Sequence, residues 1–405
     1  MGASAPTGRD VWRPFLSIWL ATFLGLTAVG AALPVLPRYV LGPLGAGNVA
    51  VGIVIGAFAA TALLARPVAG RASDVRGRRT TVVVGTALTG VGGALYFLGD
   101  LGLGLGGLVF ARLLVGAGEG VVFTAGAAWS IDLAPADRRA RVVGLYGLSV
   151  WSGLTLGPPL GEALLAVGGY SLVWIACAGL PLVGTLLALR VDEPPLPPAP
   201  DERAPLIARE AVLPGFALAF ASIGFATMAS FLVLHLDEQQ IGYGALVFAA
   251  FAATVVLTRV LGGGLPDRIG AAQAALIAAP FEAAGLALLA LAPSLAVALV
   301  GAVVMGAAFS TLFPALSIVA IQRVPEHRRG SAMGTFSAFF DLGMGVGAPL
   351  AGVAAAAAGY PAAFWLSVAA ALAGAALITR TVRAAPQPGF GHPATGVAGP
   401  TTGHS

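Results

Sequence analysis

The feature that most constrains this chain is a series of twelve apolar stretches of about 20 residues each, separated by short polar connections. A stretch of this length crosses the roughly 30 Å hydrocarbon core of a bilayer as one α-helix. The stretches lie near 15–33, 49–69, 80–99, 105–127, 142–167, 171–190, 212–235, 244–262, 271–291, 294–319, 331–358 and 361–379. Because the bilayer core offers no water to backbone N–H and C=O groups, we expect an all-α membrane protein with twelve transmembrane helices.

Composition indicates the same environment. Only 10% of the 405 residues are charged, whereas a soluble domain carries about 25%, so the outer face of the fold has to contact lipid. The single cysteine excludes an intramolecular disulfide or a cysteine-based metal site, and we expect neither a metal nor a cofactor. The net charge of +4 informs topology and does not predict a nucleic-acid partner.

The arginines predict the orientation, because short cytoplasmic loops are enriched in basic residues. With a cytoplasmic N-terminus, only Arg38 falls on the outer side and only Arg112 lies within a span. The others, including Arg66 and Arg259, are assigned to cytoplasmic ends. We therefore expect both termini in the cytoplasm and a multi-pass protein of the plasma (inner) membrane.

An internal repeat divides the chain. A shift of 193 residues places Arg66, Gly70, Asp74 and Gly77 over Arg259, Gly263, Asp267 and Gly270. A shift of 190 places Pro135, Arg138, Arg139, Gly144, Gly153 and Gly157 over Pro325, Arg328, Arg329, Gly334, Gly343 and Gly347. Because six spans are an even number, the two halves are parallel repeats, and a substrate site is expected at their interface near the midplane.

The expected domains follow from this repeat and from local composition. They are a six-helix bundle at 1–190, a proline-rich cytoplasmic linker at 191–210, a second six-helix bundle at 211–383 and a disordered tail at 384–405.

The connection between the second and third spans carries a glycine, an aspartate, a second glycine and two arginines, at Gly70, Asp74, Gly77, Arg78 and Arg79. This pattern resembles the loop signature of the major facilitator superfamily. It departs from that signature at Ala72, usually leucine, and at Val75, often arginine. The resemblance implies a conformational latch between the halves, with Asp267, Arg268 and Gly270 as its counterpart in the second half. The alternative is that the arginines only anchor the loop in the cytoplasm.

The fourth span carries Arg112 and Glu119, seven residues apart and therefore on one helix face. A charge at membrane depth is costly unless it meets a partner or a hydrated space, so this face is expected to be polar and functional. The segment resembles the family's arginine-glycine pattern, which implies proton coupling. A structural ion pair with a neighbouring helix is the alternative.

The fifth span carries Gly144, Gly153, Gly157, Pro158 and Gly161, similar to the antiporter-associated motif of the superfamily, with Glu162 in place of its last glycine. Glycines four residues apart form a smooth stripe that lets another helix approach closely. The stripe is expected at a rocking interface and favours export. Ordinary small-residue packing is the alternative.

Several other polar or aromatic residues lie within the predicted spans or at their ends. Asp341 lies centrally in the eleventh span and is a candidate proton site together with Glu119, with Arg112 tuning them. Glu162 is either a hydrated rim residue or a proton site, and Glu282 is expected to pair with a neighbour. His235 is expected at the rim, and Trp129 and Trp151 at the membrane interface, although both tryptophans could instead line the path.

The resemblance as a whole, including a weak similarity of the 225–231 segment to bacterial sugar-efflux-like and drug-efflux-like permeases, implies a secondary transporter of a small organic solute that works by alternating access and exports in exchange for protons. The partners would be that solute, protons and the bilayer, and the expected state is a monomer. A proton symporter or uniporter importing a sugar or metabolite, and a non-transporting receptor, stay open as alternatives. No metalloprotease, nucleophile-elbow or P-loop motif occurs, so an enzyme is not expected.

Overall fold

The computed structural model describes residues 12–99, 101–135, 138–193, 208–262, 264–322, 324–325 and 328–383. The first half of the chain contains α1 (Trp12–Ala32), α2 (Val35–Leu41), α3 (Asn48–Arg76), α4 (Arg78–Ala94), the short 3-10 helix η1 (Leu95–Gly99), α5 (Gly104–Leu133) and α6 (Arg139–Leu189). The second half contains α7 (Arg209–Glu238), α8 (Gly244–Gly262), α9 (Leu265–Ile269), α10 (Ala271–Ala290), α11 (Leu295–Ile321), α12 (Arg329–Ala358) and α13 (Tyr360–Arg383).

Twelve crossings result from these helices. Among the described residues, eleven helical segments are long and apolar enough to span a membrane, and one of them, α6, is a double crossing. It breaks at Gly168 and Gly169, where Gly169 has a φ of +63°, so the chain reverses between the fifth and sixth predicted spans. The all-α prediction is thereby confirmed for the described residues. The expected first span is extended, because α2 continues it beyond a turn at Leu33 and Pro34.

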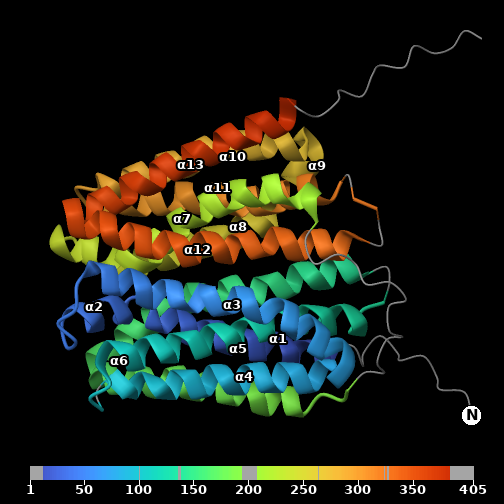
Figure 1. Ribbon diagram of the computed structural model, residues 1–405, viewed down its shortest axis with the longest axis horizontal. Coiled ribbons are helices and arrows are strands. Elements are labelled where there is room, and N and C mark those ends of the chain that lie inside the picture. Colours follow the sequence, from blue (N-terminus) through green and yellow to red (C-terminus); the bar gives the residue numbers. More distant parts are fainter. Residues whose placement is uncertain are drawn as a thin grey trace, which may run out of the picture.

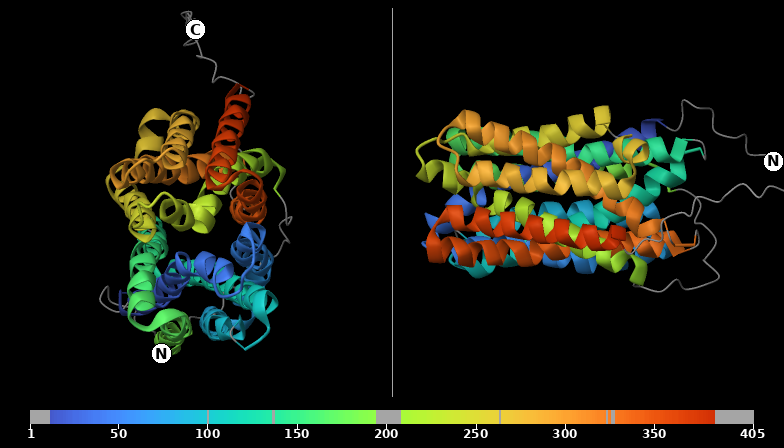
Figure 2. Two further views of the ribbon diagram at one scale, coloured as in Figure 1. Left: turned by 90° about the vertical axis from the view of Figure 1, so that its left-hand side faces the viewer. Right: turned by 90° about the horizontal axis from the view of Figure 1, so that it is seen from above.

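The helices form two bundles that lie side by side with their long axes parallel (Figure 1). One bundle contains α1 to α6 and the other α7 to α13, and the pseudo-twofold arrangement is visible along the helix axes (Figure 2). We call the end at which α1 begins and α13 ends the terminal end, and the other the distal end. Sidedness in a membrane, and the proposed division at 191–210 and 384–405, stay predictions; most of both segments lies outside the described residues.

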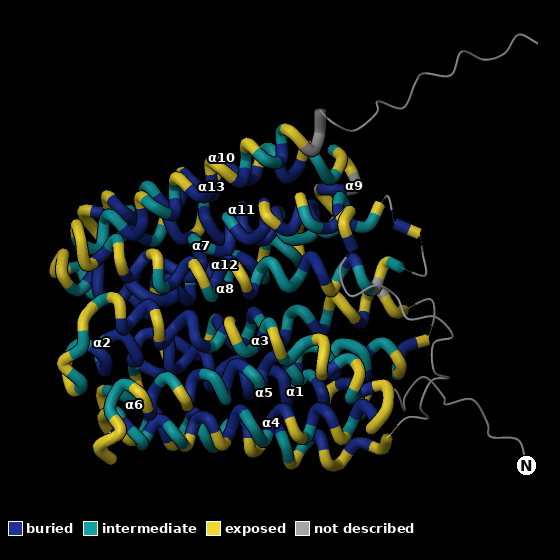
Figure 3. The backbone as a smooth tube through the Cα atoms, in the orientation of Figure 1, coloured by how far each residue is buried: buried dark blue, intermediate teal, exposed yellow. Residues whose placement is uncertain are grey.

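The halves meet along a seam formed by two helix pairs, α3 on α12 and α6 on α8. These pairs are pseudo-equivalent, since α3 corresponds to α8 and α6 to α12 in the repeat. Burial is concentrated inside each bundle and along this seam, and exposed residues follow the outer faces and the two ends (Figure 3). The seam is therefore where a buried polar site can be shared by both halves.

The glycine stripe of the fifth span packs closely on another helix, as expected, but that helix is α1 of the same half. A Cβ atom added at Gly153 would lie 2.8 Å from the carbonyl oxygen of Phe23, and one added at Gly157 would lie 2.6 Å from Cα of Gly30. In the second half, Gly343 and Gly347 pack on α7 in the same way. The expectation that this stripe forms the rocking interface is not met, because the contact lies inside a half.

Two glycines of the same motif differ sharply in their surroundings and give a matched test. A Cβ added at Gly161 would lie 2.1 Å from the carbonyl oxygen of Ala31, whereas one added at Gly144 meets no atom within 4 Å. Gly161→Ala should cost about 1–3 kcal/mol through overpacking. Gly144→Ala should be neutral or slightly stabilising, since alanine favours the helix. Thermal unfolding of the purified proteins in one detergent compares them; equal unfolding temperatures would contradict this packing.

Candidate functional site

An ion pair between Arg66 of α3 and Asp341 of α12 joins the two halves at the seam. The guanidinium donates two hydrogen bonds to the carboxylate, from Nε to Oδ2 and from Nη2 to Oδ1, the latter 3.1 Å long. The carboxylate is almost fully buried, and the guanidinium also lies 4.6 Å above the Phe123 ring. Two parallel hydrogen bonds between charged groups are among the strongest polar contacts in proteins.

The depth of Arg66 differs from the expectation that it lies at a cytoplasmic end. It precedes the end of α3 by ten residues, which places it about 15 Å inside the helix. Its partner accounts for this position, because Asp341 lies midway along α12 and neutralises the guanidinium there.

Glu119 of α5 lies in the first half, close to this pair. It is 4% exposed, and neither carboxylate oxygen has a hydrogen-bond partner among the described residues. A Cβ added at Gly25 of α1 would lie 2.5 Å from its Oε1, so the carboxylate packs directly against this glycine. The charge of Arg66 acts on Glu119 through space. Arg66 is thus paired with one acidic residue and lies near a second.

Arg112 occupies a different environment from the one expected. Its Nε donates to the carbonyl oxygen of Val54 at 3.2 Å, and Nη1 donates to the hydroxyl of Tyr96 at 3.3 Å. The guanidinium lies 4.9 Å from the centre of the Phe58 ring and is buried. Although Arg112 and Glu119 share a helix, these contacts place Arg66, and not Arg112, beside the candidate proton carriers. The coupling roles of all three remain predictions.

The second half carries a pseudo-equivalent arginine. Arg259 of α8 lies 5.7 Å from the Trp151 ring centre and 5.9 Å from that of Phe313. Its Nε is buried without a hydrogen-bond partner among the described residues. Like Arg66, it reaches across the seam, and Nη1 lies 3.5 Å from where a Cβ added at Gly147 of α6 would be. Arg259 lies in the last turn of α8, at the terminal end, and its assignment to the cytoplasmic side stays a prediction.

Trp151 belongs to an aromatic cluster that fills the centre of the seam. The cluster consists of Trp151 from the first half and Phe225, Phe248, Phe251, Phe309 and Phe340 from the second. Trp151 makes edge-to-face contacts with three of these rings at centroid distances of 5.7–6.0 Å. Both Trp151 and Trp129 are buried, so the expected placement at the membrane interface is wrong for both.

The distal end of the seam is closed. Arg38 of α2 pairs with Glu162 in its own half and with Asp237 of α7 in the other half, at 2.8 Å from Nη2 to Oδ2. Glu162 is 34% exposed, which agrees with the rim alternative. Backbones also meet here: a Cβ added at Gly52 of α3 would lie 2.3 Å from the carbonyl oxygen of Ala348 of α12.

The terminal end of the seam helices is open by comparison. A Cβ added at Gly70 of α3, at Gly144 of α6 or at Gly334 of α12 would meet no atom within 4 Å. Gly144 lies on the same face of α6 as Gly147 and Trp151, since the three are spaced by three and four residues. The face of α6 that carries Gly147 and Trp151 is therefore uncovered at Gly144, on the terminal side of Arg259.

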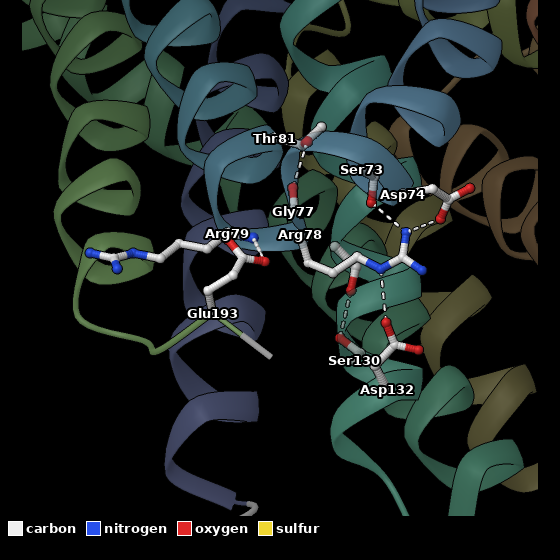
Figure 4. Close-up of polar contacts among 10 residues, drawn as sticks. Ser73, Asp74, Gly77, Arg78, Arg79, Thr81, Ser130, Asp132 and Glu193 are labelled. Carbon is white, nitrogen blue, oxygen red and sulfur yellow. Dashed lines mark hydrogen bonds and ion pairs between the residues drawn. The ribbon is translucent and has the colours of Figure 1, made fainter. Parts of the chain in front are cut away.

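The loop motif forms a compact ionic network at the terminal end of the first half (Figure 4). Arg78 donates to Asp74 and to Ser73, both at 2.6 Å, and to Asp132 of α5 at 2.8 Å. All these partners belong to one half, and among the described residues no hydrogen bond or ion pair joins this network to the second half. Asp132 was not recognised from the sequence, because its proximity depends on how α5 is placed against α3.

Glu193 caps the N-terminus of α4, the helix that begins at Arg78 of the motif. Its carboxylate accepts hydrogen bonds from the backbone N–H groups of Arg79 and Thr80, at 3.1 and 3.3 Å (Figure 4). An acidic group at a helix N-terminus accepts hydrogen bonds from backbone N–H groups that have no partner within the helix, and its charge interacts favourably with the helix dipole. In the sequence analysis Glu193 belongs to the predicted linker. Its position directly after the sixth span was the one sequence signal for a capping role.

The second copy of the motif shares the backbone geometry. Gly270 has a φ of +89° where Gly77 has +99°, so glycine is favoured at both turns. Arg268 is exposed, and the side chain of Asp267 lies outside the described part of the structure.

Two further polar residues are buried in the second half. His235 lies in the last turn of α7, near the distal rim as expected, but it is only 1% exposed, with Nε2 at 3.1 Å from the carbonyl oxygen of Leu289. Glu282 is also 1% exposed, and no described residue pairs with its carboxylate, contrary to expectation.

Comparison with known proteins identifies relatives across the whole chain. The family model of the Major Facilitator Superfamily matches residues 18–281 and again 215–400. An uncharacterized MFS-type transporter of Burkholderia pseudomallei is 34% identical over 388 residues, covering 93% of this chain and 94% of the relative. One from Salmonella typhimurium is 32% identical over 372 residues, covering 90% and 95%.

Solved structures share the fold at low sequence identity. The nucleoside transporter NupG superposes with a TM-score of 0.77 at 13% identity, covering 91% of this chain and 99% of that one. An inward-facing bacterial homologue of the human lysosomal transporter Spinster gives 0.72 at 18% identity, covering 93% and 96%. The human organic anion transporter MFSD10 gives 0.69 at 19% identity, covering 91% and 99%.

The Arg66–Asp341 pair makes a prediction about stability. Asp341→Asn leaves a largely buried arginine without its counter-ion and should cost roughly 3 kcal/mol, the low end for a broken buried pair because Arg66 is 20% exposed. Adding Arg66→Gln to that variant should restore part of the loss. The matched control is Glu282→Gln, which removes a buried carboxylate that has no described partner and should not destabilise. Thermal unfolding in detergent measures all three; equal losses for Asp341→Asn and Glu282→Gln would argue against the pair.

Proposed function

The chain belongs to the major facilitator superfamily of transporters, and we propose that it exports a small organic solute in exchange for protons by alternating access. The observation that carries this proposal is the buried ion pair of Arg66 and Asp341, which crosses the seam, with Glu119 unpaired beside it. Two carboxylates competing for one cation provide a site where the gain or loss of a proton changes how the halves are held together.

The proposed coupling follows from electrostatics in a medium of low polarity. While Asp341 is ionised, it holds Arg66 and so holds α12 against α3. Once Asp341 is protonated, the ionic contribution to this contact is lost, and Arg66 is available to Glu119 in its own half. A proton thereby shifts the equilibrium between the two arrangements of the seam, because it binds them with different affinity.

The remaining motif residues have supporting roles in this proposal. When the terminal end closes, the network around Asp74, Arg78 and Arg79 meets the second half near the motif of Arg268 and Gly270. The Gly153, Gly157 and Gly161 stripe keeps α1 and α6 together as one rigid unit that moves. Arg112, bonded to the backbone of α3 and to Tyr96, holds α3 and α5 in register.

The membrane potential is sufficient for the proposed work. One elementary charge that crosses 100 mV supplies about 2.3 kcal/mol. At about 1.4 kcal/mol per tenfold concentration ratio, this supports an accumulation of roughly fiftyfold. Nucleotide hydrolysis is not needed for such a gradient. The fold serves export and import equally, so direction has to be measured.

Everted membrane vesicles test proton exchange directly. A panel of organic acids, bases and neutral solutes is added to energised vesicles that contain the protein, and proton release is followed with a pH-sensitive dye. We expect release with at least one class of solute, lost in Asp341→Asn and reduced at least tenfold in Glu119→Gln. Glu282→Gln is the matched control and should keep coupling. Full coupling in both Asp341→Asn and Glu119→Gln would refute the assignment, and solute-driven proton uptake would indicate symport.

A further inference from the structure

The two seam arginines have similar surroundings, and their partners across the seam differ. A shift of 190 residues places Phe123 over Phe313, and the same shift places Trp151 over Asp341. Arg66 lies over Phe123 and Arg259 lies near Phe313, each reaching from its own half to the other. Where Arg66 meets the carboxylate of Asp341, however, Arg259 meets the indole of Trp151.

The second half therefore repeats the cation of the Arg66–Asp341 pair, as Arg259, without repeating its anion. No described carboxylate pairs with it, and its buried Nε has no hydrogen-bond partner among the described residues. The two rings lie 5.7 and 5.9 Å away, near the outer limit of a useful cation–π contact. Arg259 as a whole is partly buried, and a partly buried charge with such weak compensation inside the protein is suited to pairing with an anion that the protein itself does not supply.

The surroundings of Arg259 also indicate what would accompany an anion. Trp151 contacts both Arg259 and the phenyl rings of Phe251 and Phe309. The 190-residue shift places Glu119 over Phe309, so the first half has a carboxylate where the second has an aromatic ring. One side of the seam is thus acidic and the other is aromatic. An aromatic face beside a free guanidinium fits a flat apolar group that carries a negative charge.

The terminal end is the side from which we expect a solute to reach this position. Gly147 faces Arg259. Gly144 lies one turn nearer the terminal end, and a Cβ added there would meet no atom within 4 Å. The aromatic cluster and the Arg38 ion pairs close the distal side. The guanidinium is therefore on the accessible side of the cluster.

From this geometry we propose that Arg259 and Trp151 form the recognition site for an aromatic organic anion, whose carboxylate or sulfonate pairs with the guanidinium while its ring packs on the indole. The proposal rests on the transport function proposed above and assigns its substrate class. It also separates the two tasks: the Arg66 side exchanges protons, and the Arg259 side binds the solute anion.

Equilibrium binding to the full chain in lipid nanodiscs tests this site. The probes are 2-naphthoate, 2-naphthalenesulfonate, the neutral isostere 2-naphthamide and the non-aromatic cyclohexanecarboxylate, titrated by calorimetry. We expect both naphthalene anions to bind at least tenfold more tightly than the amide and the cyclohexane acid. Arg259→Gln should abolish the preference for anion over amide, and Arg259→Lys should keep part of it. Trp151→Leu should weaken both naphthalene carbonyl probes while the anion still binds better than the amide.

Thermal unfolding without solute separates recognition from a structural role. Arg259→Gln removes a partly buried charge that has no described carboxylate partner, and should leave the unfolding temperature unchanged or raised. The matched variant Arg66→Gln breaks an ion pair and should lower it. A marked loss of stability in Arg259→Gln would mean that the guanidinium is a structural element, and would count against the proposal.

Two results would overturn the recognition site: equal binding of 2-naphthoate and 2-naphthamide to the unmodified protein, or undiminished 2-naphthoate binding in folded Arg259→Gln. Neither depends on proton coupling, because no gradient is present in nanodiscs. Conversely, intact proton coupling with a neutral or basic solute would leave the proposed exchange standing and remove the anion site.

Discussion

Charge inside a membrane has to be neutralised by the protein, and this constraint determines how the two halves of the chain meet. A hydrocarbon core provides no water to arginine or aspartate, so each must find a partner or a hydrated space. In this protein the partner of Arg66 lies on the other half, so the ion pair that neutralises the arginine also joins the two halves across the seam. The connection can change because a carboxylate can take up a proton, whereas an arginine stays charged.

The repeat makes the asymmetry of the seam informative. Parallel duplication would place the same residues on both sides of the pseudo-twofold axis, and the arginines and their phenylalanines still correspond. The differences are concentrated in two positions, where Asp341 corresponds to Trp151 and Glu119 to Phe309. Residues that the fold itself requires, such as the glycines of α6 and α12, stay matched between halves. The unmatched positions are therefore where function is expected.

The two ends of the seam also differ from each other in how closely the halves approach. At the distal end, Arg38 connects α2 to α7 and the backbones of α3 and α12 are nearly in contact. At the terminal end, the glycines of the seam helices have open neighbourhoods. A pair of rigid bundles that is tight at one end and open at the other corresponds to one state of an alternating-access cycle, in which one bundle rocks against the other around the site.

Much of this fold was predictable from the sequence, and part of the site was not. Spans, repeat and the close packing at Gly157 depend on length, period and residue size, which are local properties. The depth of Arg66, the burial of Trp151 and the partners of Arg112 depend on how each helix is rotated and inserted, and an amphipathic pattern is weak when lipid and protein interior are both apolar. Asp132 and Glu193 were missed for a related reason, since each reaches a motif that is more than fifty residues away in sequence.

The central claim, that the halves pivot about the seam, is tested most directly by spin-label distances at its two ends in one protein. With Cys177 replaced by serine, labels at Pro43 and Gln239 report the distal end, and labels at Val75 and Gln322 report the terminal end. Arg38→Gln removes the cross-half pair with Asp237 and should favour opening there. The account predicts that the distal distance lengthens while the terminal distance shortens. Distances that lengthen together at both ends, or a distal change with no terminal response, would contradict the pivot.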